Sequence, residues 1–124
     1  MIRVGESQGK GRGVFAACAI GAGETIEDAP VVVVPTHQIT PLDATVLGDY
    51  YFLWSDDESE AALLLGICSL CNHSYEPNTR FELHPERLAI SFIALRDIRE
   101  GEEVTINYNG DPGNRKPLWF PVHE

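Results

Sequence analysis

A glycine-rich segment near the N-terminus, from Gly9 to Gly13, is the first part of the sequence that could hold a small ligand. Alternating glycines let the backbone approach a ligand closely and supply positive φ angles where these are needed. The segment is not a dinucleotide-binding fingerprint, because the expected strand follows the glycines instead of preceding them. Taken alone, such a stretch is more often an ordinary loop.

A polar heptapeptide, from Asn72 to Asn78, reads Asn-His-Ser-Tyr-Glu-Pro-Asn. An asparagine side chain offers one acceptor and two donors, so two asparagines around a proline-fixed turn suit a polar small ligand. A surface turn rich in asparagine would have the same pattern. The heptapeptide by itself therefore leaves a binding site and a plain turn equally open.

A third segment, from Gly101 to Tyr108, is a charged turn that leads into a strand ending on a tyrosine. A tyrosine at the end of a strand more often packs than reacts. The order of the three segments carries more information than any one of them. The glycines come first, the heptapeptide lies in the second half, and the tyrosine follows about thirty residues after Asn78.

This order and spacing resembles the SET domain family of protein lysine methyltransferases. The family pairs a glycine-rich segment with an Asn-His-Ser-x-x-Pro-Asn motif and a Gly-Glu-Glu-(Val/Ile)-x-x-x-Tyr motif, and the resemblance covers essentially the whole chain. It is greatest to the minimal, single-domain members, including viral histone methyltransferases, which share an Asp-Tyr-x-Phe segment like that at Asp49–Phe52. Residues 1–124 are accordingly expected to form one SET domain, with 109–124 as a short C-terminal tail lacking a cysteine-rich zinc segment.

The resemblance implies S-adenosylmethionine as the cofactor. Backbone at Gly11, Arg12 and Gly13 would hold its methionine moiety. Asn72 would bind the amino group of that moiety, and the backbone at His73 would meet the edge of the adenine.

The resemblance also implies that Tyr108 is the catalytic tyrosine, with its hydroxyl beside the transferring methyl group, and that Tyr50 is a second tyrosine lining a lysine channel. Trp119 and Phe120, in the tail, could cover the adenine or wall the channel, since an aromatic face suits a purine and a cationic amine. Equally, these two residues could only anchor the terminus.

Methyl transfer from a sulfonium to an amine is an in-line displacement, for which the protein supplies alignment and electrostatics. The lysine must be neutral, although its ordinary pKa is ~10.4, so an apolar channel and the adjacent sulfonium should lower that pKa.

The rival hypothesis from another class is a non-catalytic SET-like module that binds peptides. A more distant one is a small zinc module using Cys68 and Cys71, but an isolated pair of this spacing is more often two buried thiols, and no metal site is expected.

The elements that must position these residues are mainly strands. Together with the resemblance, they predict a mainly β, SET-type fold of small curved sheets with one or two short helices and a C-terminal pseudoknot. The strands are expected at 13–17, 25–34, 80–83, 88–95 and 104–106, with a hairpin loop at 84–87. Thr40 is expected to cap a helix that ends near Gly48, and a second helical turn is expected within 65–71. Residues 20–26 and 98–104 resemble each other, each as a glycine turn that feeds a strand.

The composition limits the classes of partner. Nine basic against nineteen acidic residues give a net charge of −10, which argues against direct binding to nucleic acid or an anionic membrane. The charge is compatible with a partner that is a basic, lysine-containing protein or peptide, histone-like or ribosomal.

Three cysteines and the lack of an apolar leader predict a cytoplasmic location, or a nuclear one for a viral or eukaryotic source. Because viral minimal members are dimers, a homodimer is expected.

Overall fold

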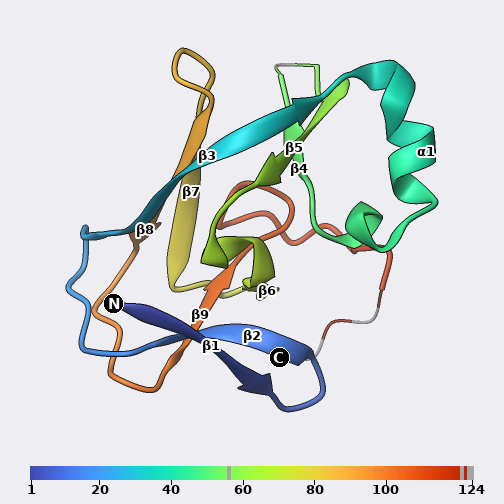
Figure 1. Ribbon diagram of the computed structural model, residues 1–124. Helices are drawn as coiled ribbons and strands as arrows, with labels where there is room; N and C mark the ends of the chain where they lie inside the picture. Colours follow the sequence, from blue (N-terminus) through green and yellow to red (C-terminus); the bar gives the residue numbers. More distant parts are fainter. Residues whose placement is uncertain (56, 121, 123–124) are drawn as a thin grey trace.

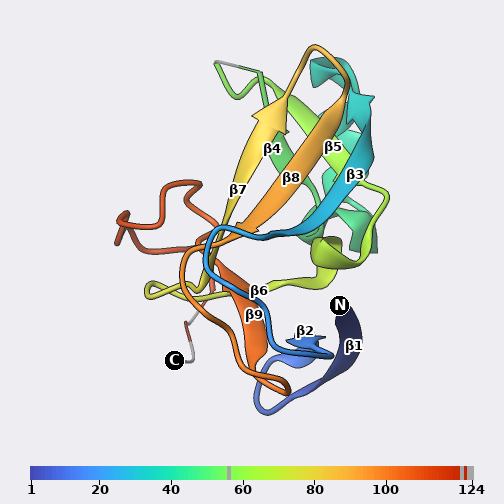
Figure 2. The same ribbon diagram turned by 90° about the vertical axis from the view of Figure 1, so that its left-hand side faces the viewer.

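The computed structural model describes residues 1–55, 57–120 and 122, and its strands form two sheets (Figure 1 and Figure 2). The small sheet has the order β1-β2-β9-β6 and the large sheet the order β4-β5-β3-β8-β7. The small sheet consists of β1 (Ile2–Ser7), β2 (Gly11–Ala16), β9 (Glu103–Ile106) and β6 (Asn72–His73). The large sheet consists of β4 (Phe52–Trp54), β5 (Glu60–Leu64), β3 (Thr25–Val34), β8 (Ala89–Ala94) and β7 (Thr79–His84). The helical segments are η1 (Thr36–Gln38), α1 (Ile39–Asp43), η2 (Val46–Asp49) and η3 (Ile67–Leu70).

The large sheet curls until its two edge strands approach each other. Phe92 of β8 is fully buried, and its ring lies 5.9 Å from that of Phe52 on β4 and 6.0 Å from that of Phe81 on β7. Phe52 and Phe81 themselves meet edge to face, with centroids 5.2 Å apart, although β4 and β7 are opposite edges of the sheet. The aromatic cluster therefore closes the sheet on itself, as the predicted curved sheets require.

The small sheet joins segments that are far apart in the sequence. β9 pairs with β2 on one side in antiparallel fashion and with β6 on the other side in parallel. Beyond β9, the chain returns across the loop that follows β6, where the Tyr75 hydroxyl donates to the carbonyl of Lys116 at 2.9 Å. The tail thus contacts an internal loop where the resemblance predicts the pseudoknot.

The two similar sequence segments face each other. Ile20 and Ile98 exchange both of their backbone hydrogen bonds, at 2.9 and 2.8 Å. Each turn then contains a glycine with positive φ, +84° at Gly23 and +85° at Gly101, followed by a glutamate whose carboxylate accepts the backbone N–H three residues earlier, at 3.1 and 3.0 Å. The internal similarity thus encodes a pair of matching turns, one leading into β3 and the other into β9.

The predicted strands are confirmed with small shifts. The strand at 25–34 has the expected bounds, and the others lie at 11–16, 79–84, 89–94 and 103–106. The expected fold class is also observed, mainly β with one short α-helix. The short β1, β4, β5 and β6 were not predicted. β5 reads Glu-Ala-Ala-Leu-Leu, residues that favour helices when isolated, and becomes a strand because it pairs with both β3 and β4.

The expected helix cap was wrong. α1 begins at Ile39 with Gln38 at its N-cap, so Thr40 lies inside the helix and no side chain caps it. The capping threonine is Thr45, whose hydroxyl accepts the N–H of Leu47 at 3.2 Å and starts η2. The last residue of η2 is Asp49, close to Gly48, where the first helix was expected to end. The segment η3 lies within 65–71, where the second helical turn was expected. Among the described residues, no helix is both long enough and apolar enough to span a bilayer.

Replacing either turn glycine with alanine should destabilise the fold by similar amounts. A Cβ at Gly23 or Gly101 would meet no atom within 4 Å, so the cost is that of a left-handed backbone, about 1 kcal/mol for each. Urea unfolding of Gly23→Ala and Gly101→Ala measures it. Gly113→Ala is the control, because a Cβ there would meet nothing closer than 3.6 Å and no left-handed φ is involved. A loss confined to one of the two turns would contradict their equivalence.

Candidate active site

Tyr108 follows β9 and is held against β6. Its backbone N–H donates to Nδ1 of His73 at 2.9 Å, and its hydroxyl donates to the carbonyl oxygen of Cys71 at 2.6 Å. The parallel pairing of Asn72 with Thr105 and of His73 with Ile106 brings these residues together. The heptapeptide and the tyrosine segment, separated in the sequence, therefore meet at one place in the fold.

Burial raises the pKa of the Tyr108 hydroxyl well above its ordinary value of 10.0, and the neighbouring Cys71, Tyr50 and Glu103 raise that pKa further. The hydroxyl is therefore neutral near pH 7. It remains a hydrogen-bond donor to the Cys71 carbonyl, and its oxygen keeps lone pairs that can accept from a ligand.

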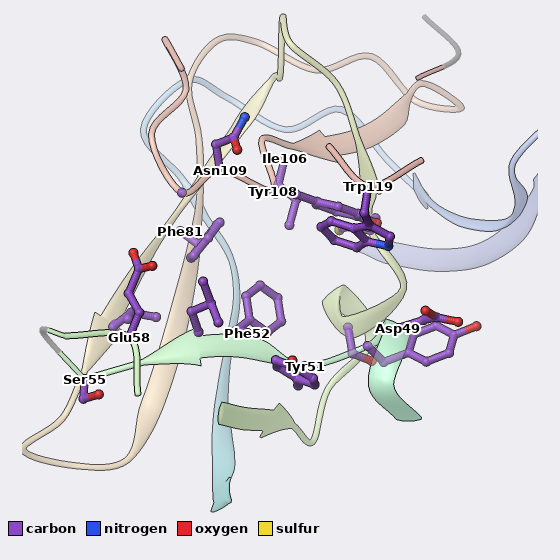
Figure 3. A pocket seen from close by; sticks show the side chains of 16 residues that line it. Asp49, Tyr51, Phe52, Ser55, Glu58, Phe81, Ile106, Tyr108, Asn109 and Trp119 are labelled. Atoms are coloured by element: carbon purple, nitrogen blue, oxygen red, sulfur yellow. The ribbon is translucent and has the colours of Figure 1, made fainter. Parts of the chain in front are cut away.

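A first cavity, of about 310 Å³, opens on one side of Tyr108 (Figure 3). Aromatic rings dominate its wall, with the Trp119 ring stacked near that of Tyr108 at a centroid distance of 6.2 Å and an angle of 18°. The carboxylates of Asp49 and Glu58 also line it, and both residues are exposed. The aromatic members of the lining are Tyr50, Tyr51, Phe52, Phe81, Tyr108 and Trp119. The cavity thus combines an apolar wall with acidic side chains.

A second cavity, of about 340 Å³, is lined by fewer residues than the first. The β1–β2 turn contributes Gly9 and Lys10, and β6 contributes Asn72 and His73. The lining is completed by Tyr108, Phe120 and Val122. Tyr108 is therefore shared by the two cavities, which makes it the residue through which a ligand on one side can meet a ligand on the other.

The Asn72 side chain is fixed from two sides. Its Nδ2 donates to the carbonyl of Arg12 at 3.1 Å and to Oε2 of Glu103 at 2.8 Å. Gly13 makes this arrangement possible, because a Cβ at that position would lie 2.5 Å from Oε2 of Glu103 and 2.8 Å from Nδ2 of Asn72. The second glycine of the strand thus lets two polar side chains pack directly against the backbone.

The tail packs two aromatic rings, 5.1 Å apart from each other, against Tyr108. Phe120 lines the second cavity and lies 6.0 Å from the Tyr108 ring, whereas Trp119 lines the first cavity and is 71% exposed. The prediction that Trp119 contacts the cofactor stays a prediction. Phe120, for which the sequence left two roles open, is the tail ring on the wall of the second cavity.

The structure brings most of the predicted site residues together. Tyr108 and Tyr50 line the first cavity, and Asn72 and His73 line the second. The segment Gly11–Gly13 contacts the Asn72 side chain but does not line either cavity. The two residues before it, Gly9 and Lys10, line the second cavity. Sequence reasoning missed Lys10 and Glu103. Both lie inside segments that it had singled out, but nothing in the pattern indicated that Lys10 lines the second cavity or that Glu103 accepts a hydrogen bond from Asn72.

Cys68 and Cys71 are buried thiols, as expected. They are 0% and 2% exposed, and a hydrogen bond with Cys71, together with burial, raises the pKa of the Cys68 thiol. Within the described part of the chain, no cluster of three or more histidine, cysteine or acidic side chains could hold a metal.

A SET domain family model matches residues 11–109. A Schizosaccharomyces pombe histone-lysine N-methyltransferase specific for H3 lysine 37 is 35% identical over 120 residues, which are 96% of this chain and 76% of that protein. A Yarrowia lipolytica histone-lysine N-methyltransferase specific for H3 lysine 36 is 34% identical over 82% of this chain, but only 14% of that protein is covered.

Solved structures share the fold. A Plasmodium falciparum protein assigned provisionally to the histone methyltransferases superposes with a TM-score of 0.71 at 26% identity, covering 90% of this chain and 99% of that one. A Chaetomium thermophilum Polycomb Repressive Complex 2 chain, bound to S-adenosylmethionine, reaches a TM-score of 0.74 at 23% identity over 86% of this chain and 15% of that one. The second likeness concerns the fold alone.

The chain belongs to the SET domain family. It is a lysine methyltransferase of that family, with S-adenosylmethionine as the methyl donor.

The stability of the fold should fall more steeply in alkali when Tyr108 is present. The pKa of Tyr108 is raised on folding, so its contribution is full below pH 10.0 and is lost as pH rises above that value. Above this pH, the unfolding free energy of the wild type should fall faster than that of Tyr108→Phe, by up to about 1.4 kcal/mol per pH unit. Urea unfolding of both proteins across this range measures the difference. Parallel pH profiles would contradict the burial of the hydroxyl.

Proposed function

We propose that this protein methylates a lysine of a histone tail, with the lysine entering the first cavity and S-adenosylmethionine bound in the second. The observation that supports this assignment is the position of Tyr108, which lines both cavities. A donor and an acceptor bound on the two sides of one residue can be aligned for in-line displacement without either leaving its own pocket.

The lining of the second cavity fits the methionine moiety of the cofactor, which carries an ammonium and a carboxylate. The carbonyl oxygen of the Asn72 amide suits the ammonium, and the Lys10 ammonium suits the carboxylate. Phe120 offers a flat apolar face to the adenine, and backbone at Gly9 allows close approach. When bound there, S-adenosylmethionine supplies the methyl group as an electrophile on a sulfonium.

The first cavity suits the side chain of lysine. Its aromatic walls, among them Tyr50, Phe52 and Trp119, would cover the methylene stem and exclude water from the amine. Desolvation disfavours the charged ammonium, so it would lower the pKa of the lysine and favour the neutral nucleophile. The Tyr108 oxygen and the Cys71 carbonyl lie 2.6 Å apart across their hydrogen bond, and in this proposal both would accept from the amine and so orient its lone pair.

A histone tail matches the charge of the protein. The net charge is −10, and the exposed Asp49 and Glu58 line the cavity that would receive the lysine. The fungal relatives are named as H3-specific enzymes, which supports the same class of substrate and a nuclear location in place of the cytoplasmic one first expected. The chain would act as a single SET domain, and we retain the homodimer as its proposed assembly.

Replacing Tyr108 with phenylalanine should lower kcat about 10²–10³-fold, because it deletes the hydroxyl, one preorganised polar group beside the reacting atoms. Methyl transfer from labelled cofactor to a histone H3 peptide measures the rate, and calorimetry with S-adenosylhomocysteine should show that the variant still binds.

Tyr75→Phe is the matched control, since it removes the hydroxyl that bonds the Lys116 carbonyl and should cost less than about tenfold. A Tyr108→Phe enzyme of near wild-type rate would contradict the assignment. If the wild type binds the cofactor and the peptide without turnover, the non-catalytic peptide-binding module is the correct description.

Neutralising the acidic side chains of the first cavity should weaken the binding of a basic peptide. Asp49→Asn and Glu58→Gln should each raise the peptide KM a few-fold at low ionic strength, and the effect should shrink as salt is added. Glu100→Gln, on the exposed turn before β9, is the control of equal charge. A KM that responds equally to all three changes would indicate only the loss of net charge.

A further inference from the structure

Glu103 has the most constrained carboxylate near the second cavity, although it does not line that cavity. Its Oε1 accepts the Ser7 hydroxyl at 2.8 Å, and its Oε2 accepts Nδ2 of Asn72 at 2.8 Å. It lies on β9, between β2 and β6, and packs over Gly13. The carboxylate therefore connects three segments of the small sheet directly behind Asn72.

The bonds of Nδ2 determine which end of the Asn72 amide is offered to a ligand. An amide nitrogen has two hydrogens, and here one goes to the Arg12 carbonyl and the other to Glu103. The Arg12 carbonyl and the Glu103 carboxylate can only accept hydrogen bonds. A flip of the Asn72 amide would therefore turn its oxygen toward two other acceptors and lose both bonds. The amide is thereby held in one orientation, in which Oδ1, an acceptor, is the group left for a ligand.

We infer that Glu103 is a positioning residue that sets the preference of the second cavity for ligands with a free α-ammonium group. The inference rests on the proposed function, in which that cavity holds the methionine moiety of the cofactor. An ammonium has three donors and no acceptor, so it pairs with Oδ1 and would be repelled by Nδ2. The negative charge of Glu103, one side chain behind the amide, adds a favourable field for the same cation.

Glutamine at position 103 would no longer fix the orientation of the Asn72 amide, although its side chain has nearly the same shape as that of glutamate. A glutamine side chain can donate as well as accept, so it can pair with either end of the Asn72 amide. The amide is then free to turn, and Nδ2 can face the cavity. A change of one atom at Glu103 should accordingly affect recognition of the amino group and leave recognition of the adenine unchanged.

The test compares the binding of two stable ligands by calorimetry: S-adenosylhomocysteine and its analogue in which hydrogen replaces the α-amino group. In the wild type, the amino group should improve Kd by about tenfold to a hundredfold, as expected for a hydrogen bond to a charged group. In Glu103→Gln, the ratio of the two Kd values should fall to within about threefold. The ratio is informative because a general loosening of the fold would weaken both ligands together.

Glu102→Gln is the matched control, since it changes the neighbouring carboxylate, which pairs with Arg96 and not with Asn72. It should keep the wild-type ratio. Thermal melting establishes that each variant is folded. If Glu103→Gln does not fold, Ser7→Ala, which removes the other hydrogen bond of Glu103, should lower the ratio by a smaller factor, and an unchanged ratio there overturns the inference.

The outcomes separate the inference from the proposed function. A wild type that binds neither ligand contradicts the proposed function itself. A wild type that prefers the amino ligand, with the same preference in Glu103→Gln, leaves that function intact and overturns the role of Glu103. Loss of the preference in Glu103→Gln alone supports the inference.

Discussion

The parallel pairing of β6 with β9 is the interaction on which the site depends. It joins only two residues on each strand, Asn72 and His73 to Thr105 and Ile106, and a ladder of this length is weak by itself. Side chains extend it. Nδ1 of His73 accepts the N–H of Tyr108 at 2.9 Å, in the place of a backbone carbonyl.

Asn78 extends the same pairing from the other end of the loop. Its Oδ1 accepts the N–H of Thr105 at 3.0 Å, and its Nδ2 donates to the carbonyl of Glu103 at 2.7 Å. The amide thus makes the donor and acceptor contacts of a missing strand residue. The heptapeptide is therefore structural at its far end and, in the proposed function, ligand-binding at its near end, which explains why one motif contains two asparagines with different partners.

The tail depends on the same kind of contact. Nδ2 of Asn107 donates to the carbonyl of Asn114 at 2.6 Å, and Nδ2 of Asn109 donates to the carbonyl of Lys116 at 3.0 Å. These bonds carry an irregular segment back to Tyr108 and bring Trp119 and Phe120, which also contact each other, within 6.2 and 6.0 Å of its ring. Because the segment has no ladder of its own, side-chain amides satisfy its backbone carbonyls.

The sequence by itself determined the class of fold, the strands with strong β-branched or apolar runs, and the three motifs, including Tyr108, Asn72 and His73. It could do so because strand periodicity and motif spacing are local properties of the chain. Only the tertiary structure decided that β5, rich in alanine and leucine, forms a strand and that Thr45 and not Thr40 is the cap. It also decided that Lys10 lines the second cavity and that Glu103 accepts a hydrogen bond from Asn72. These outcomes depend on which segments pair across long separations, and pairing partners, unlike periodicity, are not encoded within any one segment.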